Sequence, residues 1–561
     1  MDNSAIADNF SLLSRLMDIH GENPFKTKTY SIAAFNIDKL PLPLKDTPRD
    51  EIYRIQGIGK SVADKVIEML DTGRLAVLDD YIGRTPIGVI EMLNLKGLGP
   101  KKIHTIWKEM GIESVGELLY ACNENRLTLF KGFGEKTQLN VQEAIEYYMQ
   151  NAGSFLYAQI EEIFPQVDGY LKKIFPPGTV AVTGAFRRQE TTIDELEYVI
   201  LESKENVKPK FQTAQPPELL EETDSSLLYK LKNGLKLRLY TGGDNLARQL
   251  FLTTGSGEFV VTFEQEFPGL HQFKSEGDDD DAIFKNAGIP YIHPCLRESG
   301  EIIQAAKKNA MPDLIQPQDI RSIIHSHSNW SDGVNTIEEM AAECIKRGLE
   351  YLVISDHSKS AAYAKGLSEE RIREQHRYID ELNAKFAPFR IFKSIECDIL
   401  NDGSLDYSNE VLASFDLVIA SVHSNLKMSE EKAMARLLAA ISNPFTTILG
   451  HMTGRLLLSR KGYPVDHRAI IDACAAHHVV IEINAHPRRL DIDWQYIGYA
   501  KEKNVLLSID PDAHSIKGFD DTKYGVLAAQ KGGLEKTQNL SSYTLDAFAE
   551  FLERRKKIKN L

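Results

Sequence analysis

Two histidines and an aspartate lie close together in residues 323–332, IIHSHSNWSD. Side chains of a β-strand alternate between its two faces, so we expect His325 and His327 to point the same way and to bind one metal ion. Asp332 is expected to add a carboxylate from the loop that follows. A single H-x-H pair more often occurs by chance, in a protein core or on a surface, than as a metal site. The metal interpretation therefore depends on further ligands elsewhere in the chain.

Further metal ligands occur where apolar segments end in the C-terminal part of the chain, which holds eleven of the 15 histidines. Short apolar segments alternate there with amphipathic helical patterns. This alternation is typical of parallel β/α units, and seven such units predict a closed barrel. The expected strands are 322–327, 351–357, 391–400, 417–423, 446–451, 479–485 and 505–514. The chemistry of such barrels lies at the C-terminal ends of the strands.

Nearly every expected strand ends in a side chain that is able to bind a metal ion. The nine candidates, which we predict to be both metal ligands and catalytic residues, are His325, His327, Asp332, His357, Glu396, His423, His451, Asp512 and His514. Any one of these histidines is by itself more easily explained as a structural residue. Ligands at the same end of six strands are better explained by a metal centre. Six imidazoles and three carboxylates favour Zn²⁺, Mn²⁺ or Fe²⁺ over Mg²⁺, and the ligand types do not choose among those three.

A second motif occurs three times in the helical first part of the chain. Each copy reads apolar-x-Gly-apolar-Gly before a helical pattern, in residues 55–70, 95–110 and 130–145. Such a turn presents backbone N–H groups at a helix N-terminus, where the helix dipole favours an anion such as a DNA phosphate. One copy would be better explained as a tight turn between packed helices. Three copies followed by lysines indicate helix-hairpin-helix contacts with the nucleic-acid backbone. The predicted DNA-binding residues are Gly57, Gly59, Lys60, Gly97, Gly99, Lys101, Gly132 and Gly134.

Size and composition limit the remaining possibilities. A chain of 561 residues is expected to form three or four domains, and its 42% hydrophobic and 26% charged residues are those of an ordinary globular protein. No apolar run approaches the length of a membrane span, and the start MDNSAIADNF lacks the features of a signal peptide, so we expect a cytoplasmic protein without a membrane partner. The five scattered cysteines favour buried thiols over disulfides or a thiolate zinc site. The net charge of -14 argues against a globally basic nucleic-acid binder, but not against local contacts.

Residues 179–203, TVAVTGAFRRQETTIDELEYVILES, read as a strand, a turn, a short helix and a second strand. They resemble the nucleotidyltransferase palm motif G-S-x-R-R followed by D-x-D. In that motif the two aspartates and a third carboxylate hold two Mg²⁺ ions for phosphoryl transfer. Gly184 and Arg187 are kept here, whereas Glu195 and Glu197 stand at the D-x-D positions.

The third carboxylate of the palm motif comes from a strand of the form V-D-L-R, and the best match is LKLR at residues 235–238. Lys236 therefore occupies the acidic position, where an ammonium group repels a cation. The longer glutamates also shift a metal ion that demands strict octahedral geometry. We therefore expect a degenerate palm that does not polymerise. The acidic run at residues 278–281 is expected to be a solvated loop or the start of a helix.

The C-terminal motifs resemble those of the PHP (polymerase and histidinol phosphatase) domain: H-S-H-S-x-x-S-D-G, S-D-H-S, the glutamate of I-E-C-D-I-L, S-V-H, G-H and D-A-H. The whole chain resembles the bacterial PolX family, in which a family X DNA polymerase is fused to such a domain. Ile323 stands where that family usually has an aspartate. The resemblance implies a multidomain fold with an N-terminal all-α helix-hairpin-helix region, an α/β nucleotidyltransferase-like palm and thumb, and a C-terminal (β/α)7 PHP barrel. The implied domains are lyase-like residues 1–80, fingers-like residues 81–150, palm and thumb residues 151–315, and PHP residues 318–561.

The family also implies a site for up to three divalent metal ions, Mn²⁺, Zn²⁺ or Fe²⁺. One ion would be held by His325, His327, Glu396 and Asp512, a second by Glu396, His423 and His451, and a third by Asp332, His357 and His514. Three arginines that follow strand ends are candidates to bind phosphate, although they are equally well explained as surface residues of loops: Arg455, Arg488 and Arg489.

The predicted function is DNA repair by metal-dependent phosphodiester hydrolysis. The PHP barrel would be a 3′–5′ exonuclease, and the polymerase-like half would hold gapped or primer-template DNA. Three alternatives are a still-active family X polymerase, a small-molecule phosphatase of the histidinol-phosphate kind, and a noncatalytic DNA-binding protein. Lys236 argues against the first, and the second leaves the N-terminal half unexplained. The sequence leaves the oligomeric state open and is compatible with a monomer.

Overall fold

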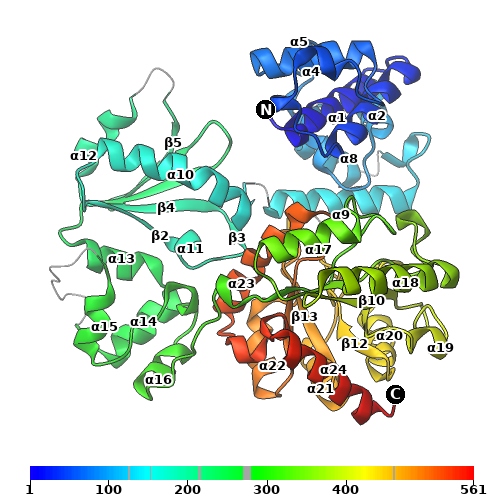
Figure 1. Ribbon diagram of the computed structural model, residues 1–561. Helices are drawn as coiled ribbons and strands as arrows, with labels where there is room; N and C mark the ends of the chain where they lie inside the picture. The colour runs from blue at the N-terminus through cyan, green and yellow to red at the C-terminus, as the bar shows by residue number, and fades with distance from the viewer. Residues whose placement is uncertain (124–126, 152, 213–215, 270–278, 459–460) are drawn as a thin grey trace. The chain divides into compact units, whose positions relative to one another are not determined.

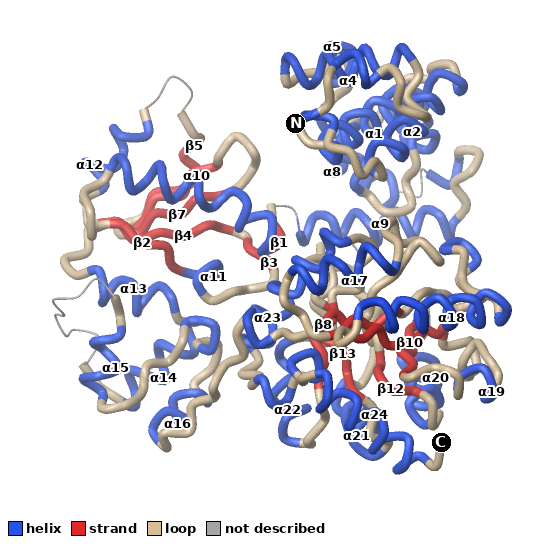
Figure 2. Tube along the Cα trace, in the orientation of Figure 1, coloured by secondary structure: helices blue, strands red, loops and turns tan. Residues whose placement is uncertain are grey.

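The computed structural model describes residues 1–123, 127–151, 153–212, 216–269, 279–458 and 461–561 (Figure 1). The chain divides into two compact units, Met1–Ala152 and Gly153–Leu561. All described strands lie in the second unit (Figure 2). No helix in the described part of the chain is long and apolar enough to cross a membrane. All five cysteines are buried and unpaired, as the sequence predicts.

The first unit is the predicted all-helical region, and its helices begin at capping residues and glycine turns. The Asp2 side chain caps α1 (Asn3–Ile19), and α2 (Pro24–Asp38) has proline in its first turn. Phe10 of α1 stacks on Tyr30 of α2 at a ring-centroid distance of 5.8 Å, within the core of this unit. The other α-helices are α3 (Arg49–Ile52), α4 (Lys60–Thr72), α5 (Ala76–Gly83), α6 (Ile87–Glu91), α7 (Pro100–His104), α8 (Val115–Asn123) and α9 (Glu135–Asn151).

The second unit begins with a five-stranded sheet in the order β2-β4-β7-β6-β5. β2 (Val180–Thr183), α11 (Gly184–Arg187) and β4 (Glu195–Ile200) match the predicted strand, short helix and strand. α10 (Tyr157–Ile174) packs its apolar side chains on this sheet (Figure 1). The remaining elements up to the barrel are β1 (Phe155–Leu156), β3 (Thr192–Ile193), α12 (Lys204–Val207), β5 (Glu218–Glu222), β6 (Ser226–Lys230), β7 (Lys236–Thr241), α13 (Leu246–Thr254), α14 (Gly257–Glu266), α15 (Asp281–Ala287) and α16 (Glu301–Lys307).

Seven parallel strands follow, paired in chain order from β8 to β14. A bridge between Ser326 and Ala513 joins the segments after the first and last strands, so the sheet is nearly closed into the predicted seven-stranded barrel. The strands are β8 (Ser322–Ile323), β9 (Tyr351–Ile354), β10 (Arg390–Asp398), β11 (Leu417–Ser421), β12 (Thr446–Leu449), β13 (Val480–Asn484) and β14 (Leu507–Asp510). The surrounding helices are α17 (Ile337–Lys346), α18 (Glu369–Phe386), α19 (Asn409–Leu412), α20 (Glu430–Ser442), α21 (His467–Ala476), α22 (Ile497–Glu502), α23 (Thr522–Lys531) and α24 (Leu545–Lys559).

The last helix, α24, packs on the N-terminal ends of the barrel strands. The ring of Phe548 stacks on that of Tyr351, the first residue of β9, at a centroid distance of 4.6 Å. It also lies 4.8 Å from the ring of Phe392 in β10. Leu540 belongs to the same buried apolar cluster. This end of the barrel is therefore filled with apolar side chains, and the polar side chains gather at the opposite end.

Candidate metal centre and nucleic-acid interface

The first two candidate ligands follow β8 and are not part of it. The prediction that a strand makes His325 and His327 share a face is wrong, because β8 ends at Ile323 and His325 has a φ of 59° in a bend. The two imidazoles still converge, since His325 Nε2 lies 3.5 Å and His327 Nε2 3.1 Å from Asp512 Oδ1. Asp512 has a positive φ of 52°. Non-glycine residues in this conformation cluster at functional sites, and here the bends bring the ligands together.

Glu396 lies at the centre of the cluster, near the end of β10, with 1% of its side chain exposed. Its Oε2 atom lies 2.9 Å from Nδ1 of His357 and 3.6 Å from Nε2 of His327. Its Oε1 atom lies 3.3, 3.1 and 2.9 Å from the Nε2 atoms of His325, His423 and His451. Imidazole nitrogens thus face both carboxylate oxygens, which suits a residue shared between two metal ions.

Asp332, His357 and His514 form a more exposed group beside this centre. Asp332 Oδ1 lies 3.6 Å from His357 Nε2, and Asp332 Oδ2 lies 3.4 Å from His514 Nε2. The side chain of His514 is 43% exposed, whereas that of His327 is fully buried. The structure therefore brings all nine predicted ligands into one cluster.

The donor atoms of this cluster fit divalent metal ions. Ligand atoms within each of three overlapping groups of side chains lie within 4.8 Å of one another. The buried atoms His325 Nε2 and Glu396 Oε2 lie close to other ligand atoms, at 3.3 and 2.9 Å, but none of these contacts in the described part of the chain has the geometry of a hydrogen bond. Buried polar atoms are rarely left unpaired, so these two are better explained as metal ligands.

Two buried carboxylates that the sequence analysis did not single out orient the imidazoles. Glu482 of β13 pairs with Nδ1 of His325, and Asp398 of β10 pairs with Nδ1 of His423. The other oxygen of Glu482 accepts a hydrogen bond of 2.6 Å from the backbone N–H of His451. Such partners fix the direction of a ligating ring and raise its basicity.

Ile323, which departs from the PHP pattern, is buried in an apolar cluster. It offers His325 no hydrogen bond, and Glu482 of β13 supplies one instead. The sequence does hold a signal for Glu482, because it interrupts the apolar run VVIEINA. A carboxylate buried in a strand needs a polar partner, and a metal ligand is one such partner.

Electrostatic interactions keep the central carboxylate charged in spite of its burial. Burial favours the neutral form, but the imidazoles of His423 and His325 hold the pKa of Glu396 well below its usual range. Burial and the charge of His514 lower the pKa of His327 to about 3. Glu396 and His327 are therefore in the forms that bind a metal ion, whereas the neighbouring carboxylates raise the pKa values of His325 and His423, which must lose a proton when a metal ion binds.

The three arginines considered for phosphate binding differ in their surroundings. Arg489 Nε lies 3.7 Å from Asp512 Oδ2, at the edge of the cluster. Arg455 pairs with Asp493 and donates a 2.9 Å hydrogen bond to the carbonyl of Arg489. Its guanidinium group therefore stabilises the loop that carries Arg489. Arg488 is exposed. Arg489 is therefore the one of the three that lies against a predicted ligand.

The three predicted DNA-binding turns in the first unit share one conformation. The glycines with positive φ, of 87°, 85° and 92°, are Gly57, Gly97 and Gly132. The second glycines, which stand directly before α4, α7 and α9, are Gly59, Gly99 and Gly134. The φ values explain the first glycine of each pair, because other residues rarely adopt them. Lys60 and Lys101 are exposed just after two of the turns.

The carboxylates of the polymerase-like sheet already have partners. Glu195 lies opposite Lys236 in the β4–β7 register, and the guanidinium group of Arg238 lies against it, with Nε 2.5 Å from Oε2. The backbone N–H of Ala185 and the hydroxyl of Tyr240 donate to Glu197 at 3.0 and 2.9 Å. The sequence pattern points to Lys236 at this site, whereas the role of Arg238 is evident only from the pairing of the two strands.

Gly184 and Arg187 also have defined neighbours in this sheet. Gly184 has a φ of 65°, and a Cβ atom there would lie 1.8 Å from Glu197 Oε1. Arg187 donates hydrogen bonds of 3.0 Å to Asp279 and to Asp280. Asp280 is fully buried and also pairs with Arg297. The prediction of a solvated run is therefore wrong for Asp280, α15 does begin at Asp281, and Asp278 lies outside the described residues.

Comparisons with known proteins agree with this architecture. A family model described as a helix-hairpin-helix domain matches residues 1–75, one described as a SAM-like helix-hairpin-helix tandem matches residues 89–146, and the PHP domain matches residues 324–486. The chain is 32% identical to the Bacillus subtilis protein named DNA polymerase/3'-5' exonuclease PolX, over 96% of this chain and 97% of that protein. The chain belongs to the bacterial PolX family. The resemblance and the multidomain fold expected from the sequence are thereby confirmed.

Other relatives match a smaller part of this PolX family member. A probable phosphatase from Caldanaerobacter subterraneus is 29% identical over 34% of this chain and 74% of its own length. A probable phosphatase from Vibrio parahaemolyticus is 26% identical over 41% of this chain and 91% of its own length. Each of these probable phosphatases thus aligns with less than half of this chain.

Proposed function

We propose that this protein hydrolyses phosphodiester bonds at the 3′ ends of DNA in the course of repair, and that its polymerase-like half holds DNA without extending it. The observation that carries the proposal is the convergence of nine potential ligands around Glu396. The Bacillus subtilis relative is named for a polymerase and a 3'-5' exonuclease activity. We extend the second of these activities to this chain.

We assign the metal ions to three groups of side chains. As the family implies, these are His325, His327, Glu396 and Asp512; Glu396, His423 and His451; and Asp332, His357 and His514. In the structure the ligand atoms also group in another way, in which His327 lies with Asp332, His357 and His514, and His357 lies with Glu396 and His423. The donor set suits Mn²⁺, Zn²⁺ or Fe²⁺. Such ions, when bound, polarise a phosphoryl group and lower the pKa of a water molecule.

Residues around the cluster would prepare it for a phosphodiester. Glu482 and Asp398 hold the rings of His325 and His423, so the ligand directions are set before substrate arrives. Arg489, at the edge of the cluster, offers a guanidinium group to a phosphate oxygen. All the residues to which we assign metal binding, orientation of the ligands and phosphate binding belong to the second unit.

The first unit and the palm would hold the DNA. The exposed glycine turns and the lysines that follow them suit contacts with phosphates, which carry no sequence information. We propose residues 1–80 and 81–150 as two DNA-binding modules, 151–315 as a palm and thumb scaffold, and 318–561 as the hydrolase. Gapped DNA or primer-template ends are the proposed substrates.

The absence of polymerase activity rests on the partners of the palm carboxylates. Glu195 is engaged by Arg238, and Lys236 stands opposite it on the neighbouring strand. Cations at these positions repel Mg²⁺ and occupy the oxygens that would bind it. A palm with these residues is suited to binding DNA and not to adding nucleotides.

A time course on a 5′-labelled primer-template with Mn²⁺ tests the exonuclease. The native protein should yield a ladder of shortened primers, and Glu396→Gln should lower the rate by about 100-fold or more while its metal content falls. Glu374→Gln, an exposed change on α18, is the matched control. Equal ladders from the native protein and Glu396→Gln would contradict the proposal.

A phosphatase acting on small phosphomonoesters is the second candidate, because the barrel resembles probable phosphatases. It predicts turnover of a small phosphomonoester and no shortening of primed DNA. The same protein preparation therefore distinguishes the two candidates.

A further inference from the structure

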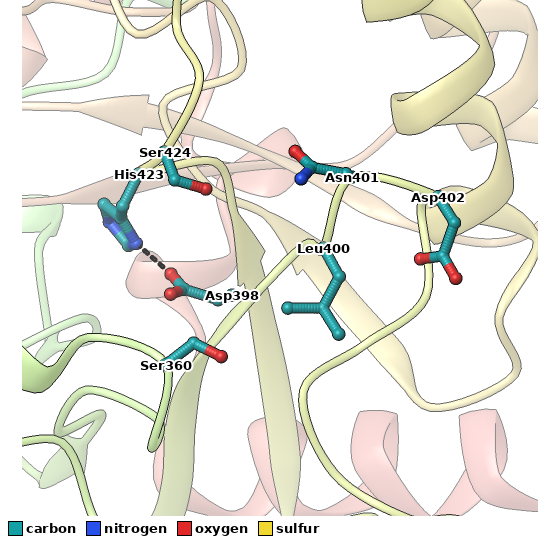
Figure 3. Close-up of a pocket in the computed structure, with 7 residues that line it drawn as sticks. All are labelled: Ser360, Asp398, Leu400, Asn401, Asp402, His423 and Ser424. Carbon is teal, nitrogen blue, oxygen red and sulfur yellow. Dashed lines mark hydrogen bonds and ion pairs between the residues drawn. The ribbon is translucent and has the colours of Figure 1, made fainter.

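A cavity of about 700 Å³ opens beside the predicted ligand His423 (Figure 3). The other residues that line it are Ser360, Asp398, Leu400, Asn401, Asp402 and Ser424. Three of them belong to the loop after β10, and Ser424 belongs to the loop after β11. This volume lies within the range of small-ligand pockets and is sufficient for a nucleoside unit.

Hydrogen bonds from a buried arginine and from an asparagine fix the walls of this cavity. Arg436 of α20 is 2% exposed and donates to the carbonyl oxygens of Leu400 and Ser424 at 2.8 and 2.9 Å. The amide of Asn425 donates to Asn401 Oδ1 at 2.7 Å. One buried arginine thus ties the two loops together, so the pocket is formed before a ligand binds.

The lining of the cavity is acidic and rich in hydrogen-bonding groups. No lysine or arginine is among its seven lining residues. Asp402 accepts hydrogen bonds from the backbone N–H and the hydroxyl of Ser404, at 3.0 and 2.7 Å, which keeps its carboxylate in place. Two carboxylates repel a phosphate group, but they accept hydrogen bonds from hydroxyl and amino groups. The cavity therefore suits an uncharged ligand with several donors.

We infer that this cavity takes the sugar and base of the terminal nucleotide of a DNA strand, while the phosphate to be cleaved lies on the metal ligands. The inference rests on the proposed function, because a nucleic-acid end places an uncharged nucleoside beside a scissile phosphate. Leu400, Asn401 and Asp402 lie together on the loop after β10 (Figure 3). In a bound nucleoside, the two polar side chains would accept hydrogen bonds from hydroxyl and N–H groups, and Leu400 would pack against its apolar surface.

Two chromogenic esters test this inference in the full chain with Mn²⁺. Thymidine 5′-(p-nitrophenyl phosphate) carries a nucleoside, and bis(p-nitrophenyl) phosphate does not. In both, water adds to phosphorus and p-nitrophenolate leaves, so the two assays share one readout. The native protein should prefer the nucleoside ester, by its kcat/KM, on the order of tenfold or more.

Variants of the pocket should lower this preference. Asn401→Ala, Leu400→Ala and the filling change Ser424→Trp should each reduce the ratio of the two kcat/KM values by about tenfold, with metal content measured alongside. An unchanged ratio in all three variants would overturn the inference. Absence of hydrolysis of both esters and of primed DNA by the native protein would instead overturn the proposed function.

Discussion

Arg238 lies against Glu195 in the polymerase-like sheet, with Nε 2.5 Å from Oε2 and Nη2 3.2 Å from Oε1 of the carboxylate. Glu396 of the barrel has imidazoles around it instead. A guanidinium group stays protonated and cannot bind a metal ion, whereas an imidazole can lose its proton and become a ligand. The two halves of the chain are therefore expected to differ in activity.

The palm should add no nucleotides to a primer. In a gap-filling assay with Mg²⁺ or Mn²⁺, the native protein and Glu197→Ala should both leave the primer unextended, because Lys236 stands at the position of the third carboxylate, opposite Glu195. Extension is measured on sequencing gels after the exonuclease is removed by Glu396→Gln in both proteins. Template-dependent addition that Glu197→Ala abolishes would show that the palm is active.

Loss of the carboxylate that orients His325 should weaken metal binding. Glu482→Gln removes the charge beside Nδ1 of His325 and should lower metal affinity by about 10-fold to 100-fold. Chelator competition followed by metal analysis measures this change, and Glu502→Gln on the exposed face of α22 is the control. An affinity equal to that of the native protein would mean that Glu482 does not support the site.

The glycine turns should contact phosphates through the lysines beside them. Lys60→Ala and Lys101→Ala should each weaken DNA binding for all sequences alike and reduce the slope of log affinity against log salt by about one. Fluorescence anisotropy over a salt series measures the slope. Lys45→Ala, an exposed lysine away from the turns, is the control, and a slope that falls equally in this variant would argue against the assignment.

Stability should depend on pH through Asp521, the residue before α23. Burial and the nearby charge of Asp520 raise the pKa of Asp521 from 3.8 to about 6. Between pH 3.8 and about 6, the folded protein therefore holds a proton on Asp521 that the unfolded chain has lost. Above about pH 6 the carboxylate is charged in the folded protein as well, and its burial lowers the free energy of unfolding. Asp521→Asn should raise the free energy of unfolding at pH 8 by about 1 kcal/mol, since solvent screens this partly exposed group.

Thermal unfolding at several pH values measures that change. The gain should be present at pH 8, should shrink as the pH falls through about 6, and should vanish below about 3.8, where the native carboxyl is protonated in both states. A gain of equal size across this range would exclude titration of Asp521 as its cause.

Much of the fold could be predicted because the barrel strands and the glycine turns carry local patterns. Alternating apolar and helical segments depend on near neighbours in the chain, and each of the seven strands begins within two residues of the expected position, although the first ends before His325. The conformation of His325 could not be predicted this way, because a positive φ at a histidine is imposed by contacts with a segment far along the chain.

The partners of the buried charged residues could not be predicted from the sequence either. Arg238 and Glu195 are far apart along the chain and meet only when β4 and β7 pair. Arg187 and Asp280 are likewise far apart along the chain and pair only in the folded structure. The sequence therefore offered no indication that Asp280, within the acidic run 278–281, would be buried. Residue type indicated that charges were present, but only the tertiary fold decides which of them are neutralised.

The most direct test compares two double variants on one labelled primer-template. His325→Ala with His327→Ala should abolish shortening of the primer and release metal, whereas Glu195→Ala with Glu197→Ala should keep both the metal content and the capacity to shorten primers. Degradation by the histidine double variant at the native rate would contradict a catalytic centre in the barrel.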